Sequence, residues 1–287
     1  MSVSKSMAWM MLAVLAAASG CDLPKRPVIE APESSEMVRV EEVITIEPPV
    51  SDWQGPWQAS FLYFRAGKAV GYNRISATYG DDRSPESLIA LPPTAKLEMN
   101  RIDQREASIW YDVEDVIHFV RGKAVFVQEM EQVLREATSG EVRAFWNRLL
   151  VGPAESQATG VVEGSQLVVD SLQGGKRGNR VIAWDADSGG TLAVMQSLRH
   201  EPLRAGETRR LKQLLPIKNE LATLTLTAVS ETSIPWIDGS TRLLLEVTQS
   251  ARIAGELVSE SVIWIDEEGE IQRTFTPSLD LVSYRVD

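Results

Sequence analysis

The hydrophobic pattern divides the chain into three stretches. Residues 7–18 are almost wholly apolar, and residues 22–56 are polar and interrupted by proline and glutamate. From Trp57 onward, short runs of β-branched and aromatic residues alternate with glycine-containing breaks, which is typical of strands joined by tight turns. We therefore predict a leader at 1–20, an extended segment at 21–56, and one β-rich domain at 57–287.

The breaks recur every ten to fifteen residues or so after Trp57, a spacing that indicates an antiparallel β-meander. The mature chain has no cysteine beyond Cys21, so this sheet is expected to be stable without an intrachain disulfide. The expected turns lie at Gly67–Lys68, Gly122–Lys123, Glu163–Gly164, Gly174–Asn179, Asp238–Gly239 and Asp266–Gly269. The fold class that we predict is mainly β, with an antiparallel meander curved into a half-barrel or a large wrapped sheet and one or two short helices.

Two stretches depart from the β pattern. Residues 189–203 contain good helix formers and end at Pro202, so they predict a helix. In residues 126–150, five apolar residues fall at helical spacing: Phe126, Met130, Val133, Leu134 and Ala137. Periodicity favours a helix there, whereas Ser139–Gly140 would also suit the turn of a long hairpin.

Cys21 is the only cysteine in the chain, and it follows directly on the small residues Ala18, Ser19 and Gly20. The apolar core before it is too short to span a bilayer as a helix. This arrangement resembles the lipobox of bacterial lipoproteins, in which the cysteine thiol receives a diacylglycerol, although Ala18 stands where leucine is commoner. The alternatives are an ordinary secretory signal or an anchor that is not cut.

The lipobox resemblance implies a cell-envelope protein, anchored to a membrane through lipidated Cys21 and facing the periplasm or the outer surface. By analogy with enteric lipoproteins, Asp22 favours the inner membrane. Two or more acyl chains anchor a protein stably because each buried methylene contributes ~0.8 kcal/mol. The Pro- and Glu-rich residues 21–56 would then form a solvated tether. Within it, residues 37–46 alternate well enough to form a strand.

The charge balance narrows the range of partners. The chain has 40 acidic and 29 basic side chains, a formal net charge of -11. Phosphate contacts require clustered lysine and arginine, so we expect no nucleic-acid partner. An acidic surface also repels anionic lipid headgroups, which leaves the lipid on Cys21 as the expected membrane contact.

Few residues suggest catalysis or metal binding. Each of the two histidines, His118 and His200, is more often a packed or capping residue than a ligand in such surroundings. Residues 174–178 lack the ending of a phosphate-binding loop, and the acidic turn at 266–270 lacks EF-hand spacing. No GxSxG elbow or HExxH motif is present. We therefore predict no catalytic residues, no metal site and no cofactor.

Tryptophan is the commonest aromatic residue in the mature chain, and aromatic side chains on strands usually fill a core. In a curved sheet they can instead line an apolar hollow. The seven tryptophans of the mature chain are Trp53, Trp57, Trp110, Trp146, Trp184, Trp236 and Trp264.

The second half of the chain resembles the β-rich N-terminal region of a group of bacterial transglutaminase-like proteins. The resemblance rests on a "PL-x-x-GE" turn, a "P-x-x-N" step, a "DG" hairpin and a closing "W-[IV]-D-x-x-GE" hairpin. The matching residues here are Pro202, Leu203, Gly206, Glu207, Pro216, Asn219, Asp238, Gly239, Trp264, Asp266, Gly269 and Glu270. The resemblance implies a half-barrel similar to periplasmic lipoprotein carriers, and it favours the hairpin over residues 126–150.

The family's catalytic domain does not follow here, because the chain ends at Asp287 just after the closing hairpin. With Cys21 committed to lipid, no thiol remains for cysteine transamidation. We therefore expect a non-catalytic lipoprotein module that binds a protein or cell-envelope partner. The alternatives are a carrier that holds a lipid or other apolar ligand in the concave face of the sheet, and a cryptic hydrolase that would use His118 or His200.

Overall fold

The structure is a computed structural model, and it describes residues 57–80, 89–100, 108–121, 124–216 and 218–287. The leader, Cys21, the tether with its expected strand at 37–46, Trp53 and the expected Gly122–Lys123 turn lie outside the described residues. The first half of the fold comprises β1 Trp57–Arg65, β2 Lys68–Tyr79, α2 Pro93–Asn100, β3 Ser108–Arg121, β4 Ala124–Ala137, β5 Val142–Val151, β6 Ala154–Glu163, β7 Gln166–Gln173 and β8 Lys176–Ala183.

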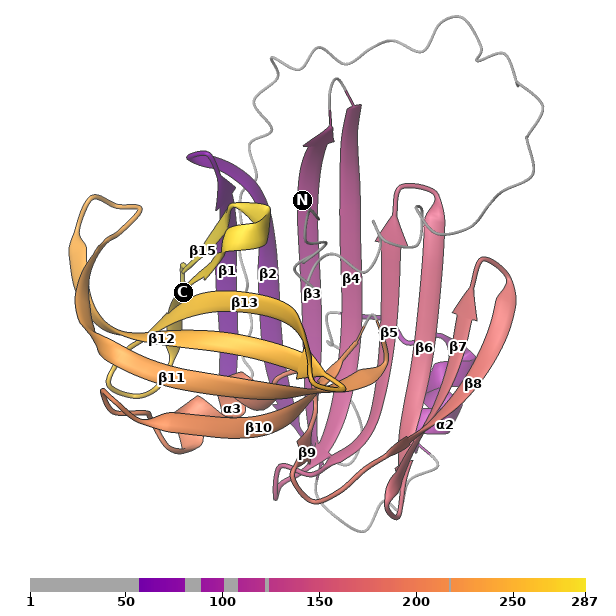
Figure 1. Cartoon of the computed structure of the whole chain (residues 1–287). Helices are drawn as coiled ribbons and strands as arrows, with labels where there is room; N and C mark the ends of the chain where they lie inside the picture. The colour runs from indigo at the N-terminus through magenta and orange to yellow at the C-terminus, as the bar shows by residue number, and fades with distance from the viewer. Residues whose placement is uncertain (1–56, 81–88, 101–107, 122–123, 217) are drawn as a thin grey trace, which may run out of the picture.

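The second half begins with a very short strand and a helix. It comprises β9 Ser188–Gly189, α3 Ala193–His200, β10 Thr208–Leu215, β11 Glu220–Pro235, β12 Thr241–Ile253, β13 Glu256–Ile265, β14 Ile271–Thr276, the 3-10 turn η1 Pro277–Leu279, and β15 Leu281–Arg285. The strands of this half cross in front of the wall formed by the first half (Figure 1).

All fifteen described strands belong to one sheet, in the order β8-β7-β6-β5-β4-β3-β2-β1-β15-β14-β13-β12-β11-β10-β9. Neighbours are antiparallel, except that β9 runs parallel to β10. Each half is a meander, and the halves join where β1 pairs with β15, with Phe61 opposite Arg285. The curved antiparallel sheet with short helices confirms the predicted fold class.

The structure confirms the hairpin over residues 126–150. β4 and β5 pair from Gln128–Val151 to Glu136–Val142, and the chain turns at Gly140, which has a φ of +88°. The helical spacing was misleading because β4 is covered on both faces. Val133 and Leu134 are adjacent and therefore point to opposite faces, yet each is fully buried.

The predicted helix at 189–203 is present but shorter, as α3. It starts at Ala193 because Ser188 and Gly189 pair with Lys212 and Gln213 of β10. A side chain on Gly189 would clash there, since an added Cβ would lie 2.6 Å from the Ala193 Cβ. Similarly, the turn expected at 174–179 is confined to Gly174 and Gly175, and β8 already begins at Lys176.

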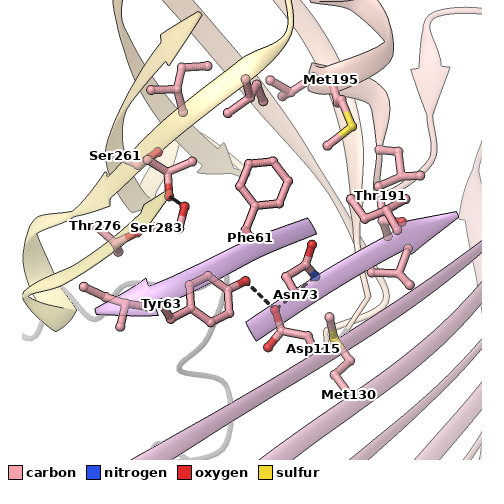
Figure 2. A pocket seen from close by; sticks show the side chains of 18 of the residues that line it. Phe61, Tyr63, Asn73, Asp115, Met130, Thr191, Met195, Ser261, Thr276 and Ser283 are labelled. Atoms are coloured by element: carbon pink, nitrogen blue, oxygen red, sulfur yellow. Dashed lines mark hydrogen bonds between the residues drawn. The ribbon is translucent and has the colours of Figure 1, made fainter. Parts of the chain in front are cut away.

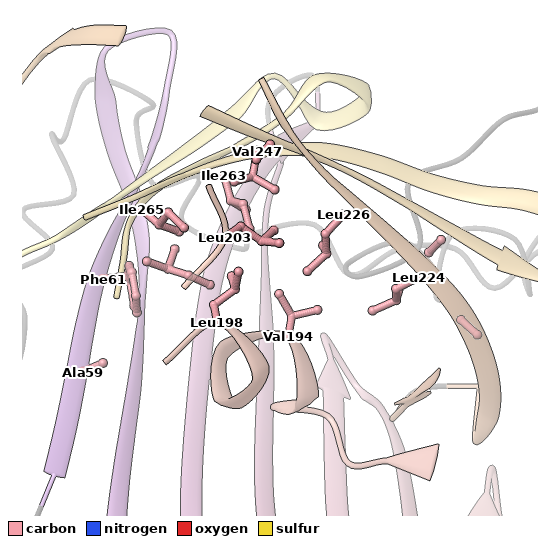
Figure 3. Close-up of a cluster of buried hydrophobic side chains, with 14 of the residues drawn as sticks. Ala59, Phe61, Val194, Leu198, Leu203, Leu224, Leu226, Val247, Ile263 and Ile265 are labelled. Carbon is pink, nitrogen blue, oxygen red and sulfur yellow. The ribbon is translucent and has the colours of Figure 1, made fainter. Parts of the chain in front are cut away.

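The two α-helices of the described residues, α2 and α3, lie on opposite faces of the sheet. α3 fills the concave side of the second half, where Val194 and Leu198 point towards Val247 and Ile263 of the arched strands (Figure 3). Helix α2, which the sequence did not suggest, packs with a different cluster: Ile89, Ala95, Met99, Trp110, Val133, Ala144 and Trp146. Leu134 packs in the cluster on the concave (inner) face of the sheet, whereas Val133 points to the opposite, convex (outer) face. Since α2 packs with Val133, it lies on the outer face.

The tryptophans mainly fill cores. Five are at most 7% exposed, namely Trp110, Trp146, Trp184, Trp236 and Trp264, and Trp57 is half-buried. On the second half, Tyr284 packs edge-on against Trp236, with ring centroids 5.2 Å apart. Arg242 and Arg273 lie over Trp236 and Trp264, at 3.9 and 4.3 Å. None of the described tryptophans lines the cavity on the concave face of the sheet.

Candidate ligand-binding cavity

The concave face of the sheet encloses a partly open cavity of about 220 Å³. Strands β1–β4 form one wall, strands β12–β15 form the opposite wall, and α3 closes one side (Figure 2). Most of the surface is apolar, with contributions from Phe61, Ile75, Val113, Met195, Ile263 and Leu281. The cavity therefore lies at the junction that the β1–β15 pairing creates.

A buried carboxyl group stands on the floor of this cavity. Asp115 of β3 is 5% exposed, and its Oδ2 accepts a hydrogen bond from the Tyr63 hydroxyl at 2.6 Å. The Asn73 side-chain amide donates to the same oxygen at 3.3 Å. Figure 2 shows these three side chains converging from β1, β2 and β3. Because Asn73 lies opposite Asp115 in the strand register, the sheet itself fixes this cluster.

Strand alternation explains why Asp115 points inward. Val113, Asp115 and Ile117 share one face of β3, and all three are buried. Glu114 lies on the opposite face, where Arg74 donates a hydrogen bond to its carboxylate at 2.9 Å. The outer carboxylate therefore has a cationic partner, whereas the inner one has only neutral partners among the described residues.

Burial dominates the electrostatics of the floor. It raises the pKa of Asp115 from 3.8 to about 6, against the opposing effect of the hydrogen bonds from Tyr63 and Asn73. Burial, together with the neighbouring Asp115 charge, also raises the pKa of Tyr63 well above 10. Near neutral pH the cavity thus holds a carboxylate and a neutral phenol.

A second polar group joins the start of α3 to the sheet. The Thr191 hydroxyl donates to Gln132 Oε1 at 2.8 Å, and Gln213 Nε2 donates to the Thr191 carbonyl at 2.8 Å. All three residues line the cavity and are buried. Gln132 Nε2 and Gln213 Oε1 have no hydrogen-bond partner. Buried polar atoms are normally paired, so these two enclosed atoms are exceptions beside the cavity.

Neither histidine lines the cavity. His118 is half-buried on the face of β3 opposite to Asp115, and burial lowers its pKa. His200 ends α3 and is exposed. The structure does not bring the two histidines together at this site, and Cys21 lies outside the described residues.

The acidic turn at 266–270 is satisfied internally. Asp266 Oδ1 accepts hydrogen bonds from the backbone N–H groups of Glu268 and Glu270, at 3.1 and 2.8 Å. Across the described ranges, no group of three or more His, Cys, Asp or Glu side chains is arranged to hold a metal ion. No helix in the described part of the chain is long and apolar enough to cross a membrane.

Sequence reasoning missed Tyr63, Asn73 and Asp115. A signal was available in "WYDVEDVIHFV", where Asp115 takes an inward position between Val113 and Ile117. An acidic residue at an otherwise apolar strand position indicates a buried carboxyl group, and such groups are concentrated at functional sites. The cluster itself requires the pairing of β1, β2 and β3, which the spacing along the chain does not specify.

The fold defines a barrel-like, open β-sheet protein. It is similar to the crystal structure of a β-barrel-like protein of domain of unknown function DUF1849 from Brucella abortus, with a TM-score of 0.52 and 10% identity, covering 80% of this chain and 95% of that chain. A DUF1089 family protein from Pseudomonas aeruginosa matches less well, with a TM-score of 0.31 and 10% identity over 59% of this chain and 84% of that chain. No protein-family model and no curated protein matches the sequence. The first likeness shows the β-rich fold, while the transglutaminase-like relationship stays a prediction.

Proposed function

We propose that this protein is a non-catalytic binding module whose concave cavity holds the apolar part of a small ligand. The observation that carries the proposal is the partly open cavity of about 220 Å³ with mainly apolar walls. Ligand pockets are typically ~300–1,000 Å³, whereas a 150 Å³ apolar cavity accepts benzene. A short hydrocarbon chain that reaches out through the opening suits this size.

The cavity changes the order of the functions expected from the sequence. A module that contacts a protein or cell-envelope partner was the leading expectation, with an apolar-ligand carrier as its alternative. An open hollow lined by Phe61, Leu192 and Leu281 on the concave side favours the carrier. The hydrolase alternative lacks comparable support, because the floor offers a carboxyl, a phenol and amides but neither histidine.

The proposal includes the membrane anchor. Lipid on Cys21 and a tether over residues 22–56 would hold the binding domain beside a membrane, on the periplasmic or outer side. The sole cysteine after Ala18, Ser19 and Gly20 supports this part. Substituting Cys21→Ala is expected to move the protein from the membrane fraction to the soluble fraction. A variant that still pellets with membranes after a high-salt wash would contradict the anchor.

The binding proposal is tested with the Cys21→Ala protein and an uncharged fluorescent apolar probe, N-phenyl-1-naphthylamine, which the Asp115 carboxylate does not repel. Two substitutions fill the cavity from opposite walls, Val113→Phe on β3 and Ser261→Leu on β13. Val125→Phe adds the same ring to an exposed position, 43% accessible, and is the control. Circular dichroism first shows which variants are folded.

We expect saturable probe binding by the parent protein and the control, and loss of at least tenfold in affinity in the folded filling variants. Native mass spectrometry of protein extracted from cells is expected to show a bound small molecule that the filling variants lack. Equal probe affinity in the filling variants would place the binding elsewhere and overturn the proposal.

A further inference from the structure

Only one of the two carboxyl oxygens of Asp115, on the cavity floor, accepts hydrogen bonds from the described residues. Tyr63 Oη and Asn73 Nδ2 both donate to Asp115 Oδ2. Among the described residues, no hydrogen bond reaches Asp115 Oδ1. This oxygen is also not sealed off, because Asp115 lines the cavity and retains a small exposed fraction. A ligand in the cavity therefore meets a carboxylate oxygen that still needs a donor.

The carboxylate also lacks a counter-charge. No lysine, arginine or histidine is found among the described residues that line the cavity, and Asp115 is the only acidic residue there. Arg74, on the adjacent strand, lies on the outer face and pairs with Glu114. A buried carboxylate without a cation is costly, and a bound cation relieves that cost.

The chemistry of the free oxygen selects among ligand head groups. Gln213 Oε1 and Gln132 Nε2, an acceptor and a donor of the same lining, also lack partners, but both atoms are fully enclosed and favour neither kind of head group. An ammonium group has three donors and no acceptor, so it suits the free acceptor Asp115 Oδ1. A ligand carboxylate, in contrast, would be repelled by Asp115.

Building on the proposed function, we propose that the ligand is an amphiphilic amine, with its ammonium group at Asp115 Oδ1 and its hydrocarbon chain along the apolar walls. Phe61, Met195 and Ile263 supply the surface for the chain. Tyr63 and Asn73 hold the carboxyl group in position through Oδ2 and leave Oδ1 for the ligand. The site thus selects by head group through Asp115 and binds the chain through its walls.

The test compares three probes that share one chain: octylamine, octanol and octanoate. Each is titrated into the Cys21→Ala protein at pH 7.5 by isothermal titration calorimetry, below its micellar concentration. Hydrogen bonds between two charged groups are stronger than those between neutral groups. We therefore expect octylamine to bind at least about tenfold more tightly than octanol, and octanoate to bind most weakly.

Two variants identify the carboxyl group responsible. Asp115→Asn keeps the side-chain size and removes the charge, so octylamine should lose its tenfold advantage over octanol. Glu114→Gln is the matched control, because it removes one charge from the neighbouring residue on the outer face, and it should leave the preference intact. The head-group series in the parent protein decides the question even if Asp115→Asn does not fold.

The outcomes separate the two proposals. Equal affinity for octylamine and octanol, or a preference for octanoate, would overturn the amine assignment while leaving the apolar cavity in place. An amine preference that persists in a folded Asp115→Asn protein would also overturn it. Failure of all three probes to bind, together with failure of the fluorescent probe, would instead remove the proposed function itself.

Discussion

The two halves of the sheet use their helices in opposite ways. In the second half, α3 lies on the concave face and fills it, with Leu198 fully buried against the arched strands. In the first half, α2 lies on the outer face, with Met99 fully buried beside Trp110 and Trp146. Because α2 lies on the outer face, the inner face of strands β1–β4 packs against the second half of the chain, and part of it forms a cavity wall.

The different positions of the two helices allow their effects on protein stability and on ligand binding to be measured separately. Both helices bury apolar side chains, so both contribute to the free energy of folding. Only α3 also contributes to the cavity, through Val194 and Met195. Substitutions under each helix should therefore have similar effects on stability and different effects on ligand binding.

The largest expected effect on stability comes from truncating the fully buried side chain of each helix. Leu198→Ala and Met99→Ala should each lower the free energy of unfolding by about 2–5 kcal/mol, since each side chain is fully buried. Urea unfolding measures this loss, and titration of the fluorescent probe measures binding. We expect Leu198→Ala to weaken probe binding and Met99→Ala to leave it unchanged. Weaker binding by folded Met99→Ala would show that the two faces are coupled.

The inner carboxyl group should make stability depend on pH. Folding raises the pKa of Asp115 to about 6. The proton on Asp115 therefore stabilises the folded protein fully below pH ~4, and this stabilisation is lost as the pH rises through 6. A shift of about two units corresponds to about 3 kcal/mol. Relative to the parent, Asp115→Asn should therefore gain up to about 3 kcal/mol between pH 4 and pH 7.

Urea unfolding at four pH values between 4 and 7 measures this gain. Tyr63, the other titratable group that lines the cavity, does not interfere because its pKa lies well above this range. Glu114→Gln is the control on the outer face. A stability difference between parent and Asp115→Asn that stays constant with pH would contradict the raised pKa.

A tight contact between α3 and the turn after β13 gives a smaller expected difference, about 2 kcal/mol between two glycine substitutions. Gly269 has a φ of +77°, and an added Cβ would lie 2.1 Å from the Leu198 carbonyl oxygen. Gly239 has a similar φ of +82°, but an added Cβ there would meet nothing within 4 Å. Gly239→Ala should cost about 1 kcal/mol from the left-handed backbone alone. Gly269→Ala should cost roughly 2 kcal/mol more in the same urea assay, and equal losses would show that α3 shifts freely.

The smallest effect concerns the ion pairs that join α3 to the closing strands. Glu270 accepts from Arg199 of α3 and from Arg285 of β15, both at 2.7 Å, and its side chain is 19% exposed. Glu270→Gln should lower stability by about 1 kcal/mol, less at high salt. Glu141→Gln, which breaks the exposed pair with Arg143, should cost no more than ~0.5 kcal/mol. Unfolding with and without added sodium chloride distinguishes the two.

Much of the β architecture could be predicted because turns are local. Gly67, Gly164 and Gly239 each lie in a turn where the sequence suggested one, and each has positive φ. Helix α2 could not be predicted in this way, because only Ala95 and Met99 of its described side chains are buried. Two residues do not make an apolar stripe, so the helix depends on the tryptophans of the sheet beneath it.

The cavity was harder to predict than the strands. The inward position of Asp115 follows from alternation along β3, and that part was accessible from the sequence. The opposite wall, however, comes from β12–β15, and it faces Asp115 only because β1 pairs with β15. That pairing joins residues more than two hundred positions apart, a distance at which local patterns carry no information.

The β1–β15 pairing also has a consequence for the folding pathway. Each half is a meander of sequential hairpins, which are local contacts and form quickly. The β1–β15 pairing, in contrast, closes a loop of more than two hundred residues. It places Phe61 opposite Arg285, and the Val286 N–H donates a hydrogen bond to the Ser60 carbonyl at 2.9 Å. During synthesis, a chain that still lacks its last strand can complete neither that join nor the second wall. We therefore expect the cavity to be the last part of the protein to form and to be absent until β15 has docked.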